Sequence, residues 1–413
     1  MKLRSKKWPL HALKCALLLS IAAVVSPKAS AAAEPCVYNN QNIISTWRGL
    51  HNDRNMVIVI AHRGWWGEHR GPSNSCGADI NYFTNNPENS FWSIMDALHT
   101  GFEAVEVDIK MTRDGVPILM HDYTLGRTTN IYQLDRQNKY DPYSGRGFNP
   151  YVNQVNWYGT LEHGFLLSTD RGHVTSAPIP AFAQLLDKYK TDNTNGLLVL
   201  DVKDRAAMQE VWRLMNDHAD SRGSLARNWV AVKFNLTTYP NPADLEADLY
   251  RHANPHGGSI NNKWNEPFLG IPVITNNMLD KLPNLVSIEE EYMQKDYTLG
   301  VEVNLNMKNG RLQQAYNAVG NALHPVGIFN PLADPYAWTG TGENQAFFQN
   351  TGRCCYRLYT VRFDDNYIER QNWSFLYGDN WKAFDFITTD EAGGMIDDLT
   401  AKHLRQGNNL MMN

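Results

Sequence analysis

Two histidines each follow a short apolar run in the first third of the chain. His62 follows the run 57–61, and His121 follows the run 116–120. An imidazole exchanges protons near neutral pH, so two of them brought together can supply the acid and the base that cleave an ester bond. A lone histidine is more often a core or surface residue, so the prediction depends on the pair. The sequence leaves open which histidine is the acid and which is the base.

Three carboxylates lie in or at the end of two other apolar runs. Glu106 and Asp108 are two residues apart in the run 104–109, so the alternation of a strand points both to one side. Asp201 lies near the end of the run 197–202 and is the natural third member. Carboxylates that converge in a barrel repel one another unless a cation joins them. Ligands that are all oxygen suit Mg²⁺ or Ca²⁺ better than Zn²⁺, so we expect a divalent metal held by these three side chains.

Three cationic side chains accompany these groups. Arg63 follows the first run, Lys203 follows the run that contains Asp201, and Lys233 lies near the end of the run 229–234. Guanidinium and ammonium groups hold phosphate oxygens, the guanidinium in a bidentate manner. We therefore expect all three to bind a phosphate. The alternatives are a structural salt bridge for Lys203 and a surface position for Lys233.

The elements that must position these residues alternate between short β-rich runs and helical stretches. Such alternation predicts an α/β fold with a parallel sheet. About eight strand candidates, with no glycine-rich dinucleotide loop after the first, favour a TIM (β/α)8 barrel, in which the carboxyl ends of the strands form one mouth. The link from Asp108 to Val116 is too short for a crossover helix, so we expect the barrel to be distorted there. The remaining strand candidates are 271–275, 300–305, 326–329 and 384–388.

Three long connections interrupt this pattern, near 64–86, 129–177 and 331–381. In a barrel, the loops that follow strands build the active face, so insertions there favour a functional role. Ordered decoration is an equally weighted alternative.

The first 33 residues are typical of a secretory signal peptide. A positive head precedes the apolar run 15–25 and small residues near 29–33. Residues 34–413 then form one barrel domain with insertions, and the protein is secreted or periplasmic. Four cysteines remain after cleavage, an even number that favours disulfides in an exported chain: Cys36, Cys76, Cys354 and Cys355.

The charge balance argues against a nucleic-acid partner. The signal segment holds six of the 38 Lys and Arg residues and no Asp or Glu, which leaves 32 basic against 43 acidic residues and a net charge of about −11. A chain this acidic lacks the cationic surface that phosphate backbones require. The expected partner is a small phosphodiester or a phospholipid head group.

A series of short motifs resembles the signature of the glycerophosphodiester phosphodiesterase family. In chain order these motifs are His62-Arg63-Gly64, Pro87-Glu88-Asn89-Ser90, Gly101, Glu106-Val107-Asp108, Thr112-Arg113-Asp114-Gly115, His121-Asp122, Arg127-Thr128-Thr129, Ile179-Pro180 and Thr388-Thr389-Asp390. The resemblance implies a distorted TIM barrel. It also implies a His62/His121 acid/base pair, metal ligands at Glu106 and Asp108, and phosphate contact by Arg63. Glu88 is expected to be structural.

Two departures from the family pattern leave the substrate open. The loop after the first motif is much longer than usual, and the fourth strand ends in Asp201-Val202-Lys203, which resembles the related sphingomyelinase D-like phospholipases. One alternative is therefore a phospholipase D-like enzyme acting on lysophospholipid or sphingomyelin, in peripheral membrane contact through aromatic residues. These aromatic residues are Trp65, Trp66, Tyr336, Trp338, Phe347 and Phe348. A second alternative is a non-catalytic surface-binding barrel.

Overall fold

The computed structural model describes residues 38–66, 86–141, 144–169, 171–253, 268–305, 310–330, 384–390, 392–405 and 410. Contacts between residues divide the chain into Met1–Ala33 and Glu34–Asn413, and all described residues belong to the second unit. The predicted signal segment, the four predicted disulfide cysteines and most of the predicted insertions 64–86 and 331–381 lie outside the described residues.

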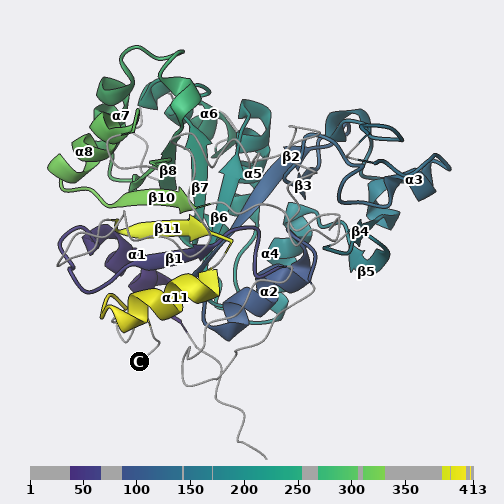
Figure 1. Ribbon diagram of the computed structural model, residues 1–413, viewed down its shortest axis with the longest axis horizontal. Coiled ribbons are helices and arrows are strands. Elements are labelled where there is room, and N and C mark those ends of the chain that lie inside the picture. The colour runs from purple at the N-terminus through teal and green to yellow at the C-terminus, as the bar shows by residue number, and fades with distance from the viewer. Residues whose placement is uncertain are drawn as a thin grey trace, which may run out of the picture. The chain divides into compact units, whose positions relative to one another are not determined.

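A closed parallel barrel forms the centre of this unit, as the strand pattern predicts (Figure 1). The ring closes because β1 pairs in parallel with both β2 and β11. Its strands are largely buried on both faces, since one face lines the barrel and the other lies under helices. The strands are β1 (Ile58–Ala61), β2 (Ala104–Met111), β6 (Leu197–Val202), β7 (Val230–Asn235), β8 (Leu269–Ile274), β9 (Val301–Val303), β10 (Val326–Asn330) and β11 (Phe386–Thr389).

The strand predicted at 116–120 is not a barrel strand. It forms β3 (Pro117–Leu119), which pairs antiparallel with the far end of β2, while β2 itself pairs in parallel with β6. The short link after Met111 allows only a hairpin, because a parallel return needs a crossover of a dozen or more residues. That crossover is supplied later, by the helix α4 (Phe182–Thr191). The predicted irregularity is therefore a hairpin added to the barrel wall.

Helices cover the barrel between most strands. The helix after β1 is capped by Ser90 at its start and by Gly101 at its end, where the φ of 107° is left-handed. Among the described residues, no helix is long and apolar enough to span a membrane. The helices are α1 (Asn40–Gly49), α2 (Phe91–Thr100), α5 (Arg205–Asp217), α6 (Pro242–Ala253), α7 (Leu285–Met293), α8 (Gln313–Asn321) and α11 (Ala392–Ala401).

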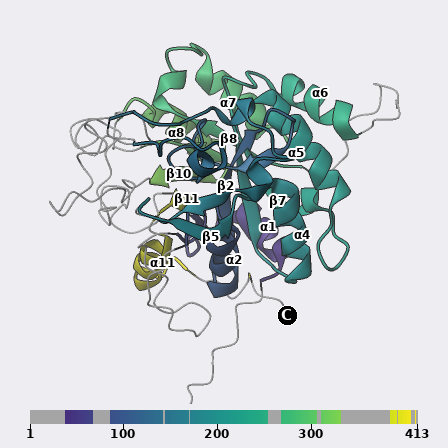
Figure 2. The same cartoon turned by 90° about the vertical axis from the view of Figure 1, so that its right-hand side faces the viewer.

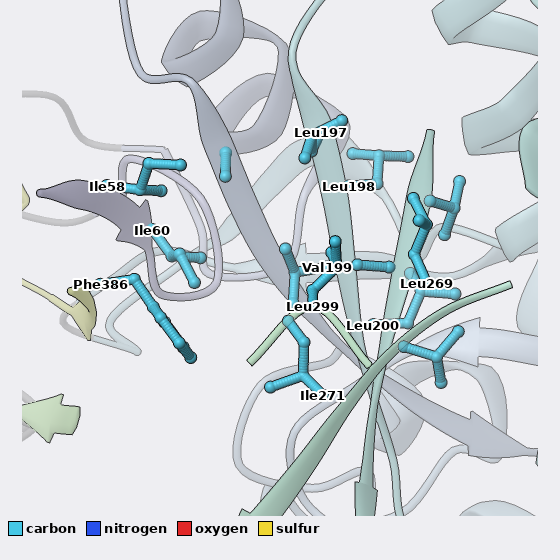
Figure 3. Packing of buried hydrophobic residues seen from close by; sticks show 14 of the residues in the cluster. Ile58, Ile60, Leu197, Leu198, Val199, Leu200, Leu269, Ile271, Leu299 and Phe386 are labelled. Atoms are coloured by element: carbon cyan, nitrogen blue, oxygen red, sulfur yellow. The ribbon is translucent and has the colours of Figure 1, made fainter. Parts of the chain in front are cut away.

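The core consists of aliphatic and aromatic side chains. Figure 3 shows Ile60, Val199 and Phe386 among these buried residues. The Phe386 ring needs a glycine beside it, because a Cβ at Gly327 would lie 2.1 Å from a ring carbon. Small residues on β10 thus accommodate an aromatic residue on the neighbouring strand β11.

The insertion predicted at 129–177 is a folded unit beside the barrel mouth (Figures 1 and 2). It has its own small apolar core, which includes Trp157, Leu161 and Leu166. Its elements are α3 (Ile131–Leu134), β4 (Phe165–Leu167), β5 (Val174–Pro178) and two short 3₁₀ turns, Val152–Gln154 and Leu161–His163.

A buried ion pair joins the C-terminal segment to the barrel. The Glu103 carboxylate accepts hydrogen bonds from both terminal nitrogens of Arg405 and from the backbone N–H of Val59, the last at 2.8 Å. Arg405 also donates to the Val57 carbonyl at 2.7 Å. Removing one partner of such a pair leaves an uncompensated charge in the interior.

We expect Arg405→Met to lower the free energy of unfolding by about 3–5 kcal/mol, because Glu103 stays buried without its partner. The matched control is Arg213→Met. Arg213 pairs with Glu210 and Asp217 with its side chain 45% exposed, so its loss should cost less than about 1 kcal/mol. Urea unfolding of both variants measures the difference. Equal losses would contradict a specific role for the buried pair.

Candidate active site

The barrel and its hairpin bring the two predicted histidines to one mouth. His62 follows β1, while β3 runs back along β2 and returns His121 to the level of Asp108. A hydrogen bond of 2.9 Å from the Met120 backbone N–H to the Asp108 carbonyl fixes this return. The antiparallel direction of β3 is therefore what places His121 beside the inward face of β2.

His62 is buried and is paired with a residue that the sequence analysis did not assign. Its Nδ1 lies 2.7 Å from the Oδ1 of Asp390, which follows β11. Burial alone would lower the pKa of His62, but the Asp390 and Glu106 carboxylates together outweigh burial and raise that pKa above its usual value. The motif Thr388-Thr389-Asp390 at the end of the last strand was the signal that could have identified this partner.

His121 has a similar partner but a different electrostatic setting. Its Nδ1 lies 2.8 Å from Oδ1 of Asp122, whose Oδ2 accepts a 2.6 Å hydrogen bond from Nε of Arg127. Burial and the positive charge of Arg63 lower the pKa of His121 to about 4. In both histidines Nδ1 contacts a carboxylate, and Nε2 of His62 lies 3.8 Å from Oε2 of Glu106.

Glu106 and Asp108 are buried on the same face of β2, as the strand alternation predicts. Glu106 accepts a hydrogen bond from the Arg63 backbone N–H at 3.1 Å, and Asp108 accepts one from the Asn89 side chain at 3.1 Å. Burial and the charge of Asp108 raise the pKa of Glu106 to about 7. Asp108 differs: burial would raise its pKa, but His121, Lys203, Lys110 and Arg63 together hold that pKa well below the usual range.

Ligand atoms of His62, Glu106 and Asp108 all lie within 4.8 Å of one another, close enough to hold one metal ion. The raised pKa of Glu106 reflects its burial and then the charge of Asp108, and a divalent cation would offset both. The donor set therefore fits a metal. Asp201 is not in this group, because its Oδ2 lies 3.0 Å from Nζ of Lys203, and its ligand role stays a prediction.

The predicted phosphate-binding cations are each engaged with carboxylates. Lys203 lies between Asp201 and Asp108, 3.3 Å from the latter, with its side chain 30% exposed. The structure thus contains the salt bridge that was the alternative for Lys203. Lys233 is buried within the barrel, so its surface alternative is wrong. Lys233 Nζ lies 2.6 Å from Glu302, a partner that the sequence analysis missed.

Three guanidinium groups surround the buried carboxylate of Glu88. Arg127 lies 2.7 Å from Oε1, Arg171 lies 2.8 Å from Oε2, and Arg63 lies 3.4 Å from Oε2. Burial would raise the pKa of Glu88, but these charges together hold it far below its usual value. Its position agrees with the structural role expected for Glu88. Arg171 was not singled out from the sequence.

Comparison with known proteins identifies one family. Residues 62–239 match the glycerophosphoryl diester phosphodiesterase family. An uncharacterized protein of Sinorhizobium fredii, y4eD, is 30% identical over 158 residues, which are 37% of this chain and 33% of that protein. Glycerophosphodiester phosphodiesterase 1 of Rattus norvegicus is 42% identical over 77 residues, 19% of this chain and 18% of that protein. The chain thus matches a third or less of the length of these relatives.

A solved structure from Silicibacter pomeroyi DSS-3, assigned to the same family, is similar over most of the chain. The TM-score is 0.50 at 16% identity, covering 88% of this chain and 99% of that one. At this identity the likeness supports the barrel fold.

We expect Asp390→Asn to lower the pKa of His62 below that of the parent protein. The substitution removes the carboxylate that raises this pKa and leaves burial and Arg63, both of which lower it. NMR titration of the imidazole, in the presence of a chelator, measures the shift. Asp280→Asn is the control, since Asp280 is 72% exposed and pairs with Arg311. An unchanged His62 pKa in Asp390→Asn would show that the contact is not electrostatically important.

Proposed function

We propose that this chain, which belongs to the glycerophosphoryl diester phosphodiesterase family through residues 62–239, hydrolyses glycerophosphodiesters to a glycerol phosphate and an alcohol. One observation carries the proposal. Two imidazoles, each with Nδ1 on a carboxylate, accompany the buried pair Glu106 and Asp108: Nε2 of His62 lies 3.8 Å from Glu106, and His121 directly follows the residue whose N–H bonds to the Asp108 carbonyl. This is the set of groups that phosphodiester cleavage needs, with an acid, a base and a place for a cation.

In this reaction one imidazole takes the proton of an attacking hydroxyl as its oxygen bonds to phosphorus. The other imidazole gives a proton to the leaving oxygen, which keeps the electron pair of the broken P–O bond. The attacker is water or a neighbouring hydroxyl of the substrate, and the latter would give a cyclic phosphate first. The Asp390 and Asp122 carboxylates hold the two rings, so that Nε2 of His62 and of His121 perform the transfers.

We assign Glu106, Asp108 and, more weakly, Asp201 to a divalent cation, Mg²⁺ or Ca²⁺. When bound, such an ion neutralises charge that builds on the phosphoryl oxygens. Arg63, Lys203 and Lys233 are the candidate phosphate-binding cations. Of these, Lys203 is the most exposed, so it can reach a substrate most readily.

The alternative, a phospholipase D-like enzyme acting on lipid, loses part of its basis. Trp65 and Trp66 are only 3% and 2% exposed, and the Trp66 indole donates to the His62 carbonyl at 3.0 Å. These two rings are therefore packed inside the protein and do not offer a lipid-binding surface. The other four aromatic residues lie outside the described residues.

Export of the protein is a further part of the proposal. The positive head and apolar run within residues 1–33 support a cleaved signal and a secreted or periplasmic enzyme. The even number of cysteines in the remaining chain supports disulfides among them. N-terminal sequencing of the exported protein and a thiol count by mass spectrometry would test both points.

We expect His62→Ala and His121→Ala each to lower kcat on glycerophosphocholine by about 10²–10⁴-fold, the usual contribution of a positioned acid or base. Release of choline and glycerol phosphate measures turnover, and circular dichroism checks folding. His163→Ala is the control, because the side chain of His163 is 69% exposed. If either variant keeps the turnover of the parent, the substituted histidine does not take part in catalysis. Parallel assays on lysophosphatidylcholine and sphingomyelin distinguish the phospholipase D-like alternative from the proposed activity. If the protein turns over none of these substrates, the result favours the non-catalytic binding barrel.

We expect a chelator to abolish turnover and Mg²⁺ or Ca²⁺ to restore it. Glu106→Gln should raise the metal concentration needed for half-maximal turnover strongly, because Glu106 lies within the close group of ligand atoms. Asp201→Asn should raise it less, since Asp201 already pairs with Lys203. Metal titration of both variants beside the parent makes the measurement. An unchanged requirement in Asp201→Asn would remove Asp201 from the ligand set.

A further inference from the structure

His121 follows the hairpin strand β3, which packs on both the barrel and the insertion, since Leu119 belongs to the barrel core. Met120 and Leu125, which flank it, belong to the small apolar cluster of the insertion together with Trp157 and Leu166. The buried core of the barrel is a separate cluster. The distance between the two imidazoles therefore depends on how the insertion is docked on the barrel.

One side chain of the insertion enters the site. Arg171 is 1% exposed, and its Nη2 lies 2.8 Å from Oε2 of Glu88. Its backbone has a φ of 59°, a left-handed conformation that is uncommon for a residue with a side chain, and its N–H donates to the Ser168 carbonyl at 2.7 Å. The chain thus adopts a tight turn that directs this guanidinium inward.

From Glu88 a short series of buried ion pairs leads to His121. Oε1 of Glu88 accepts from Nη2 of Arg127 at 2.7 Å, and Nε of Arg127 donates to Oδ2 of Asp122 at 2.6 Å. Oδ1 of Asp122 lies 2.8 Å from Nδ1 of His121. Each member holds the next in a fixed orientation, because bidentate guanidinium–carboxylate pairs restrict both partners.

The two oxygens of Glu88 carry unequal contacts. Oε1 accepts from Arg127 at 2.7 Å, while Oε2 accepts from Arg171 at 2.8 Å and, at 3.4 Å each, from Arg63 and Arg127. Arg171 therefore makes the shortest contact with Oε2 and holds the carboxylate so that Oε1 faces Arg127. Without Arg171, the carboxylate can turn toward Arg63, and the pairing that orients Asp122 weakens.

We propose that Arg171 is a positioning residue that docks the insertion on Glu88 and, through Arg127 and Asp122, holds His121 at its working distance from His62. The insertion is then part of the active site and not decoration. This inference rests on the proposed function, because it assigns Arg171 a role in that reaction. A misplacement of about 1 Å can cost on the order of 10²-fold in rate, so a docking contact can have a large effect without touching the substrate.

The experiment compares Arg171→Leu, Arg171→Lys and the control Arg146→Leu, which alters an exposed arginine of the same insertion. Turnover of glycerophosphocholine is measured over a range of substrate concentrations. We expect Arg171→Leu to lower kcat by about 10–100-fold with KM changed by less than about threefold. Arg171→Lys keeps the charge and should recover part of the loss, and Arg146→Leu should match the parent.

Amide hydrogen exchange gives a second readout that does not need turnover. The Met120 amide bonds to the Asp108 carbonyl at 2.9 Å and reports the docking of the hairpin, whereas the Val199 amide in β6 reports the barrel. In both Arg171 variants we expect the Met120 amide to exchange faster than in the parent. The exchange rate of the Val199 amide should be unchanged. If Arg171→Leu fails to fold, Arg171→Lys carries the test, with a smaller loss of kcat.

The outcomes separate this inference from the proposed function. If the parent protein turns over no glycerophosphodiester, the proposed function fails, and faster exchange at Met120 still supports the docking role. If the parent is active and the Arg171 variants keep its kcat, or lose melting temperature alone, Arg171 is merely structural and the inference is overturned. A rise in KM at constant kcat also overturns it, because that pattern belongs to substrate binding.

Discussion

Two carboxylates buried side by side on one face of β2 are the constraint on which the rest of the site depends. Glu106 and Asp108 point the same way because strand side chains alternate, and the closed barrel leaves them little water. Their repulsion has to be offset by neighbouring groups. Asp108 pairs with Lys203, accepts a hydrogen bond from Asn89 and has a lowered pKa, whereas the pKa of Glu106 is raised to about 7. The protein's own charges thus compensate Asp108 and leave Glu106 only partly compensated.

The strands and the main site residues could be predicted because their signals are local. Apolar runs, alternation and motif order identify β1, β2 and β6 and the side chains at their ends. The direction of β3 was missed, since a strand pattern does not say whether its partner is parallel. The partners Asp390 and Glu302 were missed for another reason. Asp390 is 328 positions from His62 along the chain, and Glu302 is 69 positions from Lys233. A single sequence gives no information on which distant residues are in contact.

The turn after β1 explains how the site tolerates the long connection that departs from the family pattern. Arg63 and Asn89 both have left-handed backbones, with φ of 58° and 54°, and the Asn89 N–H donates to the Arg63 carbonyl at 3.0 Å. A Cβ at Gly64 would lie 2.6 Å from Ser93, so the chain passes directly against the start of α2. The two ends of the connection are therefore fixed to each other beside the site. Its length can vary without moving His62.

The two histidines are held by structures of different kinds. His62 is bound to Asp390 from β11, so its position is set when the first and last strands pair and the barrel closes. His121 is bound to Asp122 on a hairpin whose neighbours pack in the insertion. Parallel barrel strands have a fixed register, whereas a docked unit can shift as a body. We therefore expect the spacing of the two imidazoles to be most sensitive to the ion pair between Arg171 of the insertion and Glu88, which is buried where water cannot weaken it.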